Sequence, residues 1–229
     1  MNTRETNKAI RRRRILDAAR QILADGGYGD LTTRGLAEAA GVTVPTIYNL
    51  LGGKDEVLAT LIAEGTERVW EQWTLPESNT SLDTVDAWFD ACESVIANDE
   101  PATRAMVVAS GRVAGLYTAH EDGRPEGPAW RAVAMATRLC SSLKDSGLLR
   151  GRISPETLGA QMFICFRDPL WDWGFGQIGL DEFKRRFARG VYMLLCSDAT
   201  DTTRQGLINR IVKLQASDTA ELAAAAGEA

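Results

Sequence analysis

Side chains able to do acid–base, nucleophilic or metal chemistry are few and scattered in this chain of 229 residues. His120 is the single histidine, and it lies in a polar loop, where a lone imidazole is ordinarily solvated. Cys92, Cys140, Cys165 and Cys196 are widely spaced without a CxxC pair, as expected of reduced thiols rather than of disulfides or a zinc site. No GxSxG, HExxH or phosphate-binding glycine loop is present. The sequence therefore predicts no metal, no cofactor and no enzymatic activity.

A second group of polar side chains is spaced like one face of a short helix. The turn at Gly41-Val42 separates two short helical segments, which is typical of a helix-turn-helix whose second helix enters the DNA major groove. That groove is about 12 Å wide and admits one helix with a small polar face. The second segment has such a face, formed by Thr43, Thr46, Tyr48 and Asn49, whereas Val42, Ile47 and Leu50 can be buried.

Basic residues concentrate at the N-terminal end. The formal net charge is −5, but residues 1–54 carry +4 and residues 55–229 carry −9. Arg11, Arg12, Arg13 and Arg14 form a continuous run. A basic end on an acidic body indicates that only this end meets a polyanion, although the run alone is equally compatible with a solvated helix start.

Apolar residues recur at three- and four-residue intervals nearly throughout, which predicts helices separated by glycines and polar loops. The first helix ends at Gly26-Gly27, Thr32 and Thr43 begin two short helices, and Lys54 opens a longer one. Later helices are expected near 82–97, 101–117, 129–149, 154–175, 180–196 and 202–215. The predicted fold is all-α. It comprises a three-helix head at 1–53 with the helix-turn-helix, a connecting helix into an all-α body at 54–215, and a disordered tail at 216–229.

The stretch LTTRGLAEAAGVTVPTIYNLLGGKDEVL (31–58) resembles the DNA-binding signature of TetR-family transcriptional regulators. That signature runs Thr-x-x-x-hydrophobic-Ala, then Ala-Gly-Val-Ser/Thr, Thr-hydrophobic-Tyr and a Lys that opens the next helix. The matching residues are Thr32, Leu36-Ala37, Ala40-Gly41-Val42-Thr43, Thr46-Ile47-Tyr48 and Lys54. The resemblance covers roughly residues 10–62. This chain departs from the family at Pro45, and at Asn49-Leu50-Leu51, where His and an aromatic residue are common.

The resemblance implies a set of DNA-binding residues. Asn49 would read an adenine edge together with groove-facing Arg34 and Thr46, while Tyr48 and Lys54 would clamp the backbone. The full expected set is Arg11, Arg12, Arg13, Arg14, Thr32, Arg34, Thr43, Val44, Pro45, Thr46, Tyr48, Asn49 and Lys54. For Thr32 and Thr43 a purely structural capping role is an equal alternative, and Tyr48 could simply pack.

The body is expected to dimerise and to bind a small molecule. Two-fold dimers bind both halves of a palindrome, and the apolar stripe of residues 180–196 could form the interface through Phe183, Phe187, Val191, Leu194 and Leu195. An apolar or aromatic effector could be lined by Trp88, Phe89, Met106, Trp130, Met162, Phe166 and Trp171. The alternative for both sets is ordinary core.

These observations lead to one functional expectation. The chain is predicted to be a cytoplasmic repressor that binds a palindromic double-stranded DNA operator as a homodimer and is released by an apolar or aromatic small molecule. Its start has no apolar stretch typical of a secretory signal, and no apolar run approaches the roughly 20 residues that span a bilayer. The alternative is a helical apolar-ligand-binding protein, or a small-molecule enzyme, whose head does not bind DNA.

Overall fold

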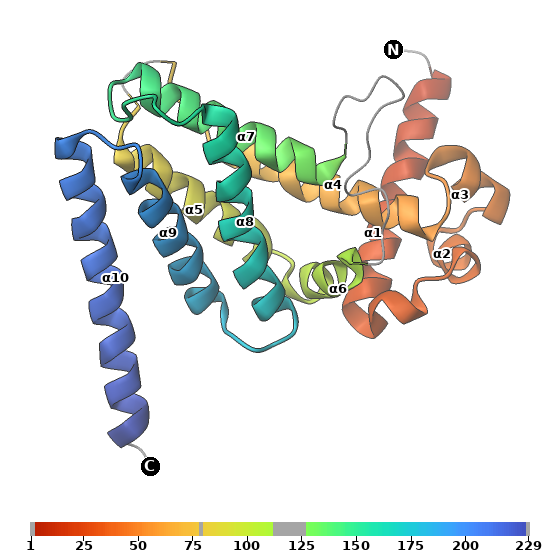
Figure 1. Ribbon diagram of the computed structural model, residues 1–229. Helices are drawn as coiled ribbons and strands as arrows, with labels where there is room; N and C mark the ends of the chain where they lie inside the picture. The colour runs from red at the N-terminus through yellow and green to blue at the C-terminus, as the bar shows by residue number, and fades with distance from the viewer. Residues whose placement is uncertain (1–2, 78–79, 112–126, 228–229) are drawn as a thin grey trace. The chain divides into compact units, whose positions relative to one another are not determined.

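The computed structural model describes residues 3–77, 80–111 and 127–227, and these residues are predominantly helical (Figure 1). The helices are α1 (Thr3–Asp30), α2 (Thr33–Ala40), α3 (Val44–Leu50), α4 (Lys54–Gln72), α5 (Leu82–Ala97), α6 (Glu100–Ser110), α7 (Pro128–Asp145), α8 (Pro155–Gly174), α9 (Leu180–Cys196) and α10 (Asp201–Gly227). The described part has no named strand, only an isolated bridge between Leu149 and Ala199. The predicted all-α fold is confirmed. His120 lies outside the described residues.

The chain divides into two compact units. The first comprises the described residues of Met1–Glu71, Ser94–Arg131 and Gly174–Gln177, and the second those of Gln72–Glu93, Ala132–Trp173 and Ile178–Ala229. The first unit is therefore larger than the three-helix head predicted for residues 1–53, because it also contains nearly all of α4 and the whole of α6.

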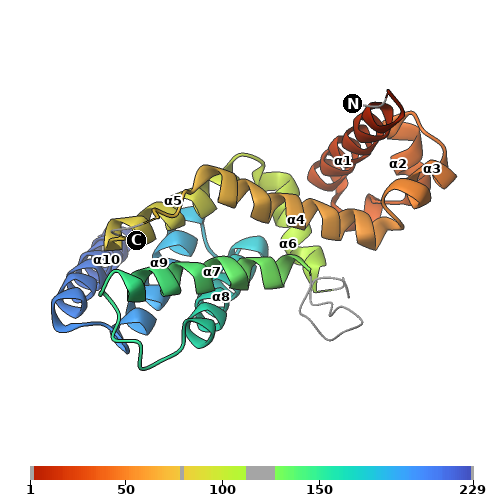
Figure 2. The same ribbon diagram turned by 90° about the horizontal axis from the view of Figure 1, so that it is seen from above.

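The core of the first unit joins the helix-turn-helix to α1, α4 and α6. Its fully buried side chains include Ile15 and Leu23 of α1, Ile47 of α3 and Leu58 of α4. Helix α6 contributes Ala102, Met106 and Ala109 to the same cluster. Figure 2 shows α1, α2 and α3 grouped together at one end of this unit. One hydrophobic core thus fixes the short helices, which would be marginal in isolation.

Glycines and a threonine set the helix ends near the motif. Gly27 interrupts α1, with φ 73° and ψ −171°, at the place where the sequence predicts that the first helix ends. The N-cap of α2 is Thr32, whose hydroxyl accepts a hydrogen bond from the Gly35 N–H at 3.1 Å. Gly41 ends α2 in the left-handed region, at φ 61°.

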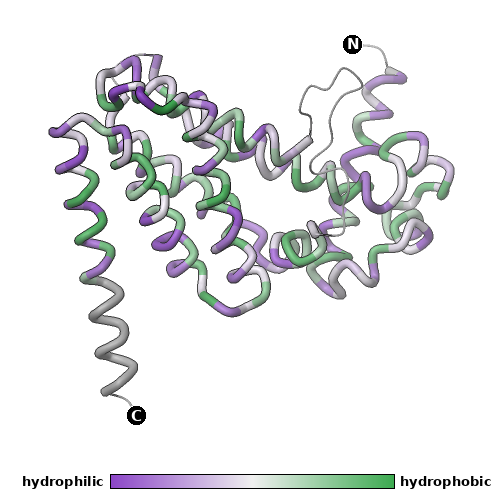
Figure 3. The backbone as a smooth tube through the Cα atoms, in the orientation of Figure 1, coloured by the Kyte–Doolittle hydropathy of each residue, from purple (hydrophilic) through white to green (hydrophobic). Residues whose placement is uncertain are grey.

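The core of the second unit is a cluster of aromatic rings. The centroid of the Phe187 ring lies 5.3 Å from that of Trp88, 4.8 Å from that of Phe89 and 5.2 Å from that of Phe166. Each of these ring pairs is arranged edge to face. The indole N–H of Trp88 donates to the sulfur of Met135 at 3.1 Å. Hydrophobic and hydrophilic stretches alternate along the helices, as expected when each helix buries one face (Figure 3).

Three helix ends differ from the sequence predictions. Helix α6 ends at Ser110, and residues 112–117 of the helix predicted at 101–117 lie outside the described residues. Helix α7 ends at Asp145 rather than near 149, because the chain turns at Gly147 with φ 73°. Helix α10 continues to Gly227, where a disordered tail is expected from residue 216. The tail residues include the run AELAAAA, and alanine has the highest intrinsic helix propensity. Within the described ranges, no helix combines the length and the apolar character needed to cross a membrane.

Candidate nucleic-acid interface

The turn between α2 and α3 depends on Gly41. Its N–H donates to the Glu38 carbonyl at 3.1 Å, and the next N–H, of Val42, donates to the Ala37 carbonyl at 2.9 Å. These bonds satisfy carbonyls that the helix end leaves without partners. The left-handed φ favours glycine at this position, and a Cβ at Gly41 would lie 2.7 Å from the guanidinium of Arg14 and displace it.

Helix α3 has one buried and one exposed side. Ile47 is fully buried in the core of the first unit, whereas the next residue, Tyr48, is 56% exposed. Pro45 and Asn49 are also exposed, and Val44 and Thr46 are half-buried. The exposed side is short and carries hydrogen-bonding groups, which is the arrangement of a helix that reads base edges.

The two threonines at helix starts differ in their contacts. Thr32 caps α2 through its side chain and is exposed, as is Arg34 in the following turn. Thr43 occupies the N-cap position of α3, but its hydroxyl makes no capping bond to the backbone. The Thr43 hydroxyl instead hydrogen-bonds to that of Thr46 at 2.8 Å. Of the two predicted side-chain caps, the structure contains the one at Thr32.

The arginine run has two kinds of member. Arg12 donates from Nη1 to the carbonyl of Leu50 at 3.1 Å, and Arg14 donates from Nη2 to the carbonyl of Ala40 at 2.7 Å. Leu50 and Ala40 are the last residues of α3 and α2, where a cation is favourable because carbonyls are unpaired and the helix dipole is negative. Sequence reasoning missed this role, since the partners lie 38 and 26 residues away.

All four arginines are exposed, so the other two members differ in their contacts and not in their exposure. Arg13 forms only a long ion pair of 3.9 Å with Asp17, in which both side chains are largely exposed. Ion pairs of this kind contribute little to stability. Arg11 and Arg13 are therefore the members of the run best placed to meet phosphates.

Lys54 is positioned by a residue that the sequence analysis did not single out. Its ammonium lies 4.3 Å from the ring centroid of Tyr28, in a cation–π contact. The Tyr28 hydroxyl in turn donates a hydrogen bond to Asp55, the next residue after Lys54. Tyr28 directly follows Gly26-Gly27, where the sequence predicts the end of the first helix, but only the fold brings Tyr28 to the start of α4.

Three of the residues expected to line an effector pocket pack around one ring, and the others lie elsewhere. Met106 belongs to the core of the first unit, whereas Trp88, Phe89, Met162 and Phe166 lie in the second unit. Trp130 and Trp171 are 37% and 42% exposed. Trp88, Phe89 and Phe166 pack directly on Phe187. This packing agrees with the alternative that these residues belong to an ordinary hydrophobic core.

The residues expected at a dimer interface also require a correction. Phe183, Phe187, Val191 and Leu195 are buried within the second unit of a single chain, and only Leu194 is half-buried. The apolar stripe of α9 therefore faces its own protomer. Periodicity identified the apolar face correctly but could not distinguish an internal neighbour from a partner subunit.

Comparison with known proteins agrees with this geometry. Residues 15–61, from the first core residue of α1 into α4, match the family model described as "Bacterial regulatory proteins, tetR family". Residues 15–61 thus resemble the DNA-binding region of TetR-family regulators. The matched stretch contains the whole helix-turn-helix and ends before the second unit begins.

Two curated TetR-type relatives extend the match beyond the motif. The chain is 30% identical over 96 residues to the HTH-type transcriptional repressor KstR of Rhodococcus jostii, covering 42% of this chain and 45% of the relative. It is 40% identical over 65 residues to the HTH-type transcriptional repressor Rv1474c of Mycobacterium tuberculosis, covering 28% of this chain and 35% of that protein. The chain thus spans less than half the length of these relatives.

Solved structures show the same fold over most of the chain. SmeT, the repressor of the Stenotrophomonas maltophilia multidrug efflux pump SmeDEF, has a TM-score of 0.60 at 20% identity, over 84% of this chain and 92% of SmeT. A TetR-family structure from Syntrophomonas wolfei has a TM-score of 0.63 at 14% identity, over 81% and 95% of the two chains. At these identities the likeness establishes the fold alone.

Proposed function

We propose that this chain is a cytoplasmic, ligand-responsive transcriptional repressor of the TetR family that binds a palindromic operator as a homodimer. The observation that carries the proposal is helix α3, which buries Ile47 and exposes Tyr48 and Asn49 beside a basic N-terminal helix. The names of the curated relatives, both HTH-type repressors, support the same function. Residues 1–53 and Lys54 would contact DNA, and the remainder of the chain would dimerise and bind the effector.

Each contact has a chemical reason. The Asn49 carboxamide can donate to and accept from the edge of an adenine, and Arg34 and Thr46 would face the same groove. Arg11 and Arg13 would meet phosphates as flexible exposed cations. Arg12 and Arg14 would act indirectly, by holding the C-terminal ends of α3 and α2 against α1.

The release of DNA is proposed to follow from an apolar or aromatic small molecule that acts through α6. Ala102, Met106 and Ala109 of this helix share one core with Ile15 and Leu23 of α1. Because a packed core has discrete arrangements, a ligand that displaces α6 would also displace α1 and the motif packed on it. The ligand would need only to prefer the conformation that binds DNA poorly.

The decisive experiment is selection of bound duplexes from a random DNA pool with the full chain, read by sequencing. Recovery of a two-fold palindrome is the expected result. The selected duplex is then titrated with the wild type and with Asn49→Ala, which we expect to bind more weakly by about 1–3 kcal/mol, or roughly 5- to 150-fold.

Salt dependence and a matched variant sharpen the test. Wild-type affinity should fall steeply with salt concentration because phosphate contacts release counterions. Gln21→Ala, on the exposed surface of α1 outside the predicted DNA-binding set, is the control and should bind like the wild type. If folded protein at low salt enriches no sequence, the proposal is wrong. If Asn49→Ala binds DNA like the wild type, Asn49 is not one of the residues that contact the bases.

A further inference from the structure

Lys54 occupies a helix position that is unfavourable for a cation. It is the first residue of α4, where the positive end of the helix dipole favours carboxylates such as the following Asp55 and Glu56. A lysine at this position does not stabilise the helix, so its role is more readily explained by binding than by folding. A phosphate contact would use this cation, provided that its charge stays available.

The ring of Tyr28 restrains the Lys54 ammonium without neutralising it. The ammonium lies 4.3 Å from the ring centroid, and the face of an aromatic ring attracts cations through its quadrupole but has no net charge. Among the residues that the structure describes, no carboxylate forms an ion pair with Lys54, although Asp55 follows it directly. The ring contacts one side of an ammonium that has three N–H donors, so donors remain for a phosphate.

Tyr28 is itself held in place at both ends. It is half-buried and packs against the hydrophobic core of the first unit. Its hydroxyl donates a hydrogen bond to Asp55, the exposed carboxylate next to Lys54 in the chain. One side chain thus contacts the cation through its ring and the adjacent anion through its hydroxyl.

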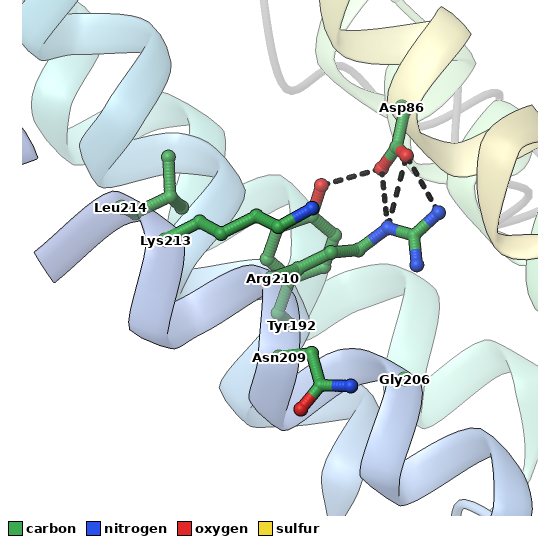
Figure 4. A pocket seen from close by; sticks show the side chains of 7 residues that line it. All are labelled: Asp86, Tyr192, Gly206, Asn209, Arg210, Lys213 and Leu214. Carbon is green, nitrogen blue, oxygen red and sulfur yellow. Dashed lines mark hydrogen bonds and ion pairs between the residues drawn. The ribbon is translucent and has the colours of Figure 1, made fainter. Parts of the chain in front are cut away.

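A second tyrosine, Tyr192, shares its hydrogen-bond partner with a cation whose charge is neutralised. In the second unit, Arg210 donates from Nε to Asp86 Oδ2 at 2.9 Å and from Nη2 to Asp83 at 2.5 Å. The Tyr192 hydroxyl donates to the same Asp86 (Figure 4). Carboxylates therefore match the charge of Arg210, as suits a contact that joins helices within the protein. Lys54 has no such match within the described ranges, as suits a cation that meets an external anion.

We propose that Tyr28 is a positioning residue for DNA binding, whose ring preorganises Lys54 for a phosphate of the DNA backbone. This inference rests on the DNA binding proposed above for the first unit. A flexible lysine loses conformational entropy when it binds, and a side chain already restrained on a ring loses less. One exposed cation–π contact corresponds to a gain in affinity of about two- to fivefold.

The test is a double-mutant cycle on duplex DNA. A duplex of about 30 base pairs and arbitrary sequence is the probe, at low salt, because a phosphate contact requires no particular base. Lys54→Ala should weaken binding and reduce the salt slope by about one, as expected for one lost phosphate contact. Tyr28→Leu should weaken binding about two- to fivefold in the wild-type background but have no effect in the Lys54→Ala background. A tyrosine with a purely structural role would weaken binding in both backgrounds.

Aromatic variants separate the charge distribution of the ring from its shape. Tyr28→Phe keeps the ring and loses the hydroxyl, and it should bind DNA within about twofold of the wild type. Phenylalanine analogues with increasing fluorine content at position 28 keep the shape of the ring but withdraw negative charge from its face. We expect them to bind DNA progressively more weakly. This series remains decisive if Tyr28→Leu does not fold.

Lys144→Ala, at an exposed position of α7 in the second unit, is the control and should keep the wild-type affinity and salt slope. Circular dichroism confirms that each variant is folded. The proposal is overturned if Tyr28→Leu weakens binding equally in both backgrounds, if fluorination has no effect, or if Lys54→Ala keeps the wild-type slope. Stronger binding by Tyr28→Leu would also overturn it, because the ring would then compete with the phosphate.

The same assay distinguishes this inference from the proposed function. If the wild type binds DNA and the Tyr28 variants bind equally well, the positioning role is wrong and the repressor function stands. If the folded wild type binds no DNA at low salt, both are wrong.

Discussion

At the scale of single residues, the arginine run combines two tasks that its sequence does not separate. All four are exposed, but Arg14 and Arg12 each donate to the carbonyl of a terminal helix residue, whereas Arg13 makes only a long surface ion pair. A cation that caps a helix C-terminus stabilises the protein, and one that meets a phosphate stabilises the complex. Substitutions within the run should therefore separate folding from binding.

Arg14→Ala and Arg11→Ala provide this separation. Arg14→Ala removes a 2.7 Å charge-assisted bond, and we expect the free energy of unfolding to fall by about 1 kcal/mol. Arg11→Ala should leave stability within about 0.5 kcal/mol but lower DNA affinity and reduce the salt slope by about one. Urea denaturation and salt titrations measure the two effects. Equal stability of both variants would contradict the capping role of Arg14.

Residue-level roles could be predicted from the sequence where they depend on neighbours in the chain. The cap at Thr32, the buried Ile47 and the exposed Asn49 follow from local spacing, and the structure places all three as expected. The roles of Arg14 and Tyr28 could not be predicted, because their partners lie 26 and 27 residues away and meet them only in the folded unit.

At the scale of elements, the turn between α2 and α3 determines the direction of α3. Gly41 has a left-handed φ of 61°, and its missing Cβ leaves room for Arg14. Gly147, just after the end of α7, has a similar φ of 73°, but a Cβ added there would meet no neighbouring atom within 4 Å. Both glycines thus have a left-handed φ, but only Gly41 has a guanidinium next to the position that a Cβ would occupy.

Gly41→Ala and Gly147→Ala isolate the effect of that neighbour. Left-handed strain should cost each variant about 1 kcal/mol of unfolding free energy. Gly41→Ala should lose more unfolding free energy than Gly147→Ala, because its side chain also displaces Arg14. It should also bind DNA more weakly, whereas Gly147→Ala should bind DNA like the wild type. Urea denaturation and operator titration measure these quantities. Wild-type DNA affinity of Gly41→Ala would show that the turn tolerates a side chain.

The cysteines test the packing of the second unit, since all four lie in it. Burial raises the pKa of the Cys140 thiol to about 12 and raises that of Cys92 as well. The thiolate is the reactive form, so at pH 8 Cys140 should be only about 10⁻⁴ ionised, and labelling of the native protein should increase as the pH rises toward 12. Labelling with a disulfide reagent at pH 8, with and without urea, measures this. Rapid native labelling of Cys92 and Cys140 would contradict a packed core there.

Helix periodicity predicted the elements better than their partners. The ranges 82–97 and 180–196 coincide with α5 and α9, because their apolar spacing and flanking loops are local features. The same pattern could not show that Phe183 and Phe187 face their own protomer, or that Met106 belongs to the core of the first unit. Both depend on which helix covers a given apolar stripe, and that is decided by tertiary packing.

At the scale of the whole molecule, the proposed dimer needs an apolar surface other than the buried stripe of α9. The second unit offers Met193 of α9, 60% exposed, and Ile208 and Val212 of α10, 41% and 54% exposed. Ile208 and Val212 are four residues apart and thus share one side of α10. Helices α9 and α10 pack together, so these residues lie on neighbouring elements (Figure 1).

A charge placed on this surface should therefore prevent dimerisation while leaving the fold intact. The wild type is expected to scatter light with twice its chain mass of 24.9 kDa, and the double variant Met193→Glu/Val212→Glu with the single mass. Burying two carboxylates in an apolar interface is unfavourable, whereas both positions are solvated in the monomer. The control is Val108→Glu in the first unit, 43% exposed, which should remain dimeric.

On a palindromic operator the double variant should bind half-sites independently and lose the tight complex, because one head alone makes too few contacts. Monomeric wild type at micromolar concentration would contradict the dimer, and a dimeric double variant would place the interface elsewhere on the chain.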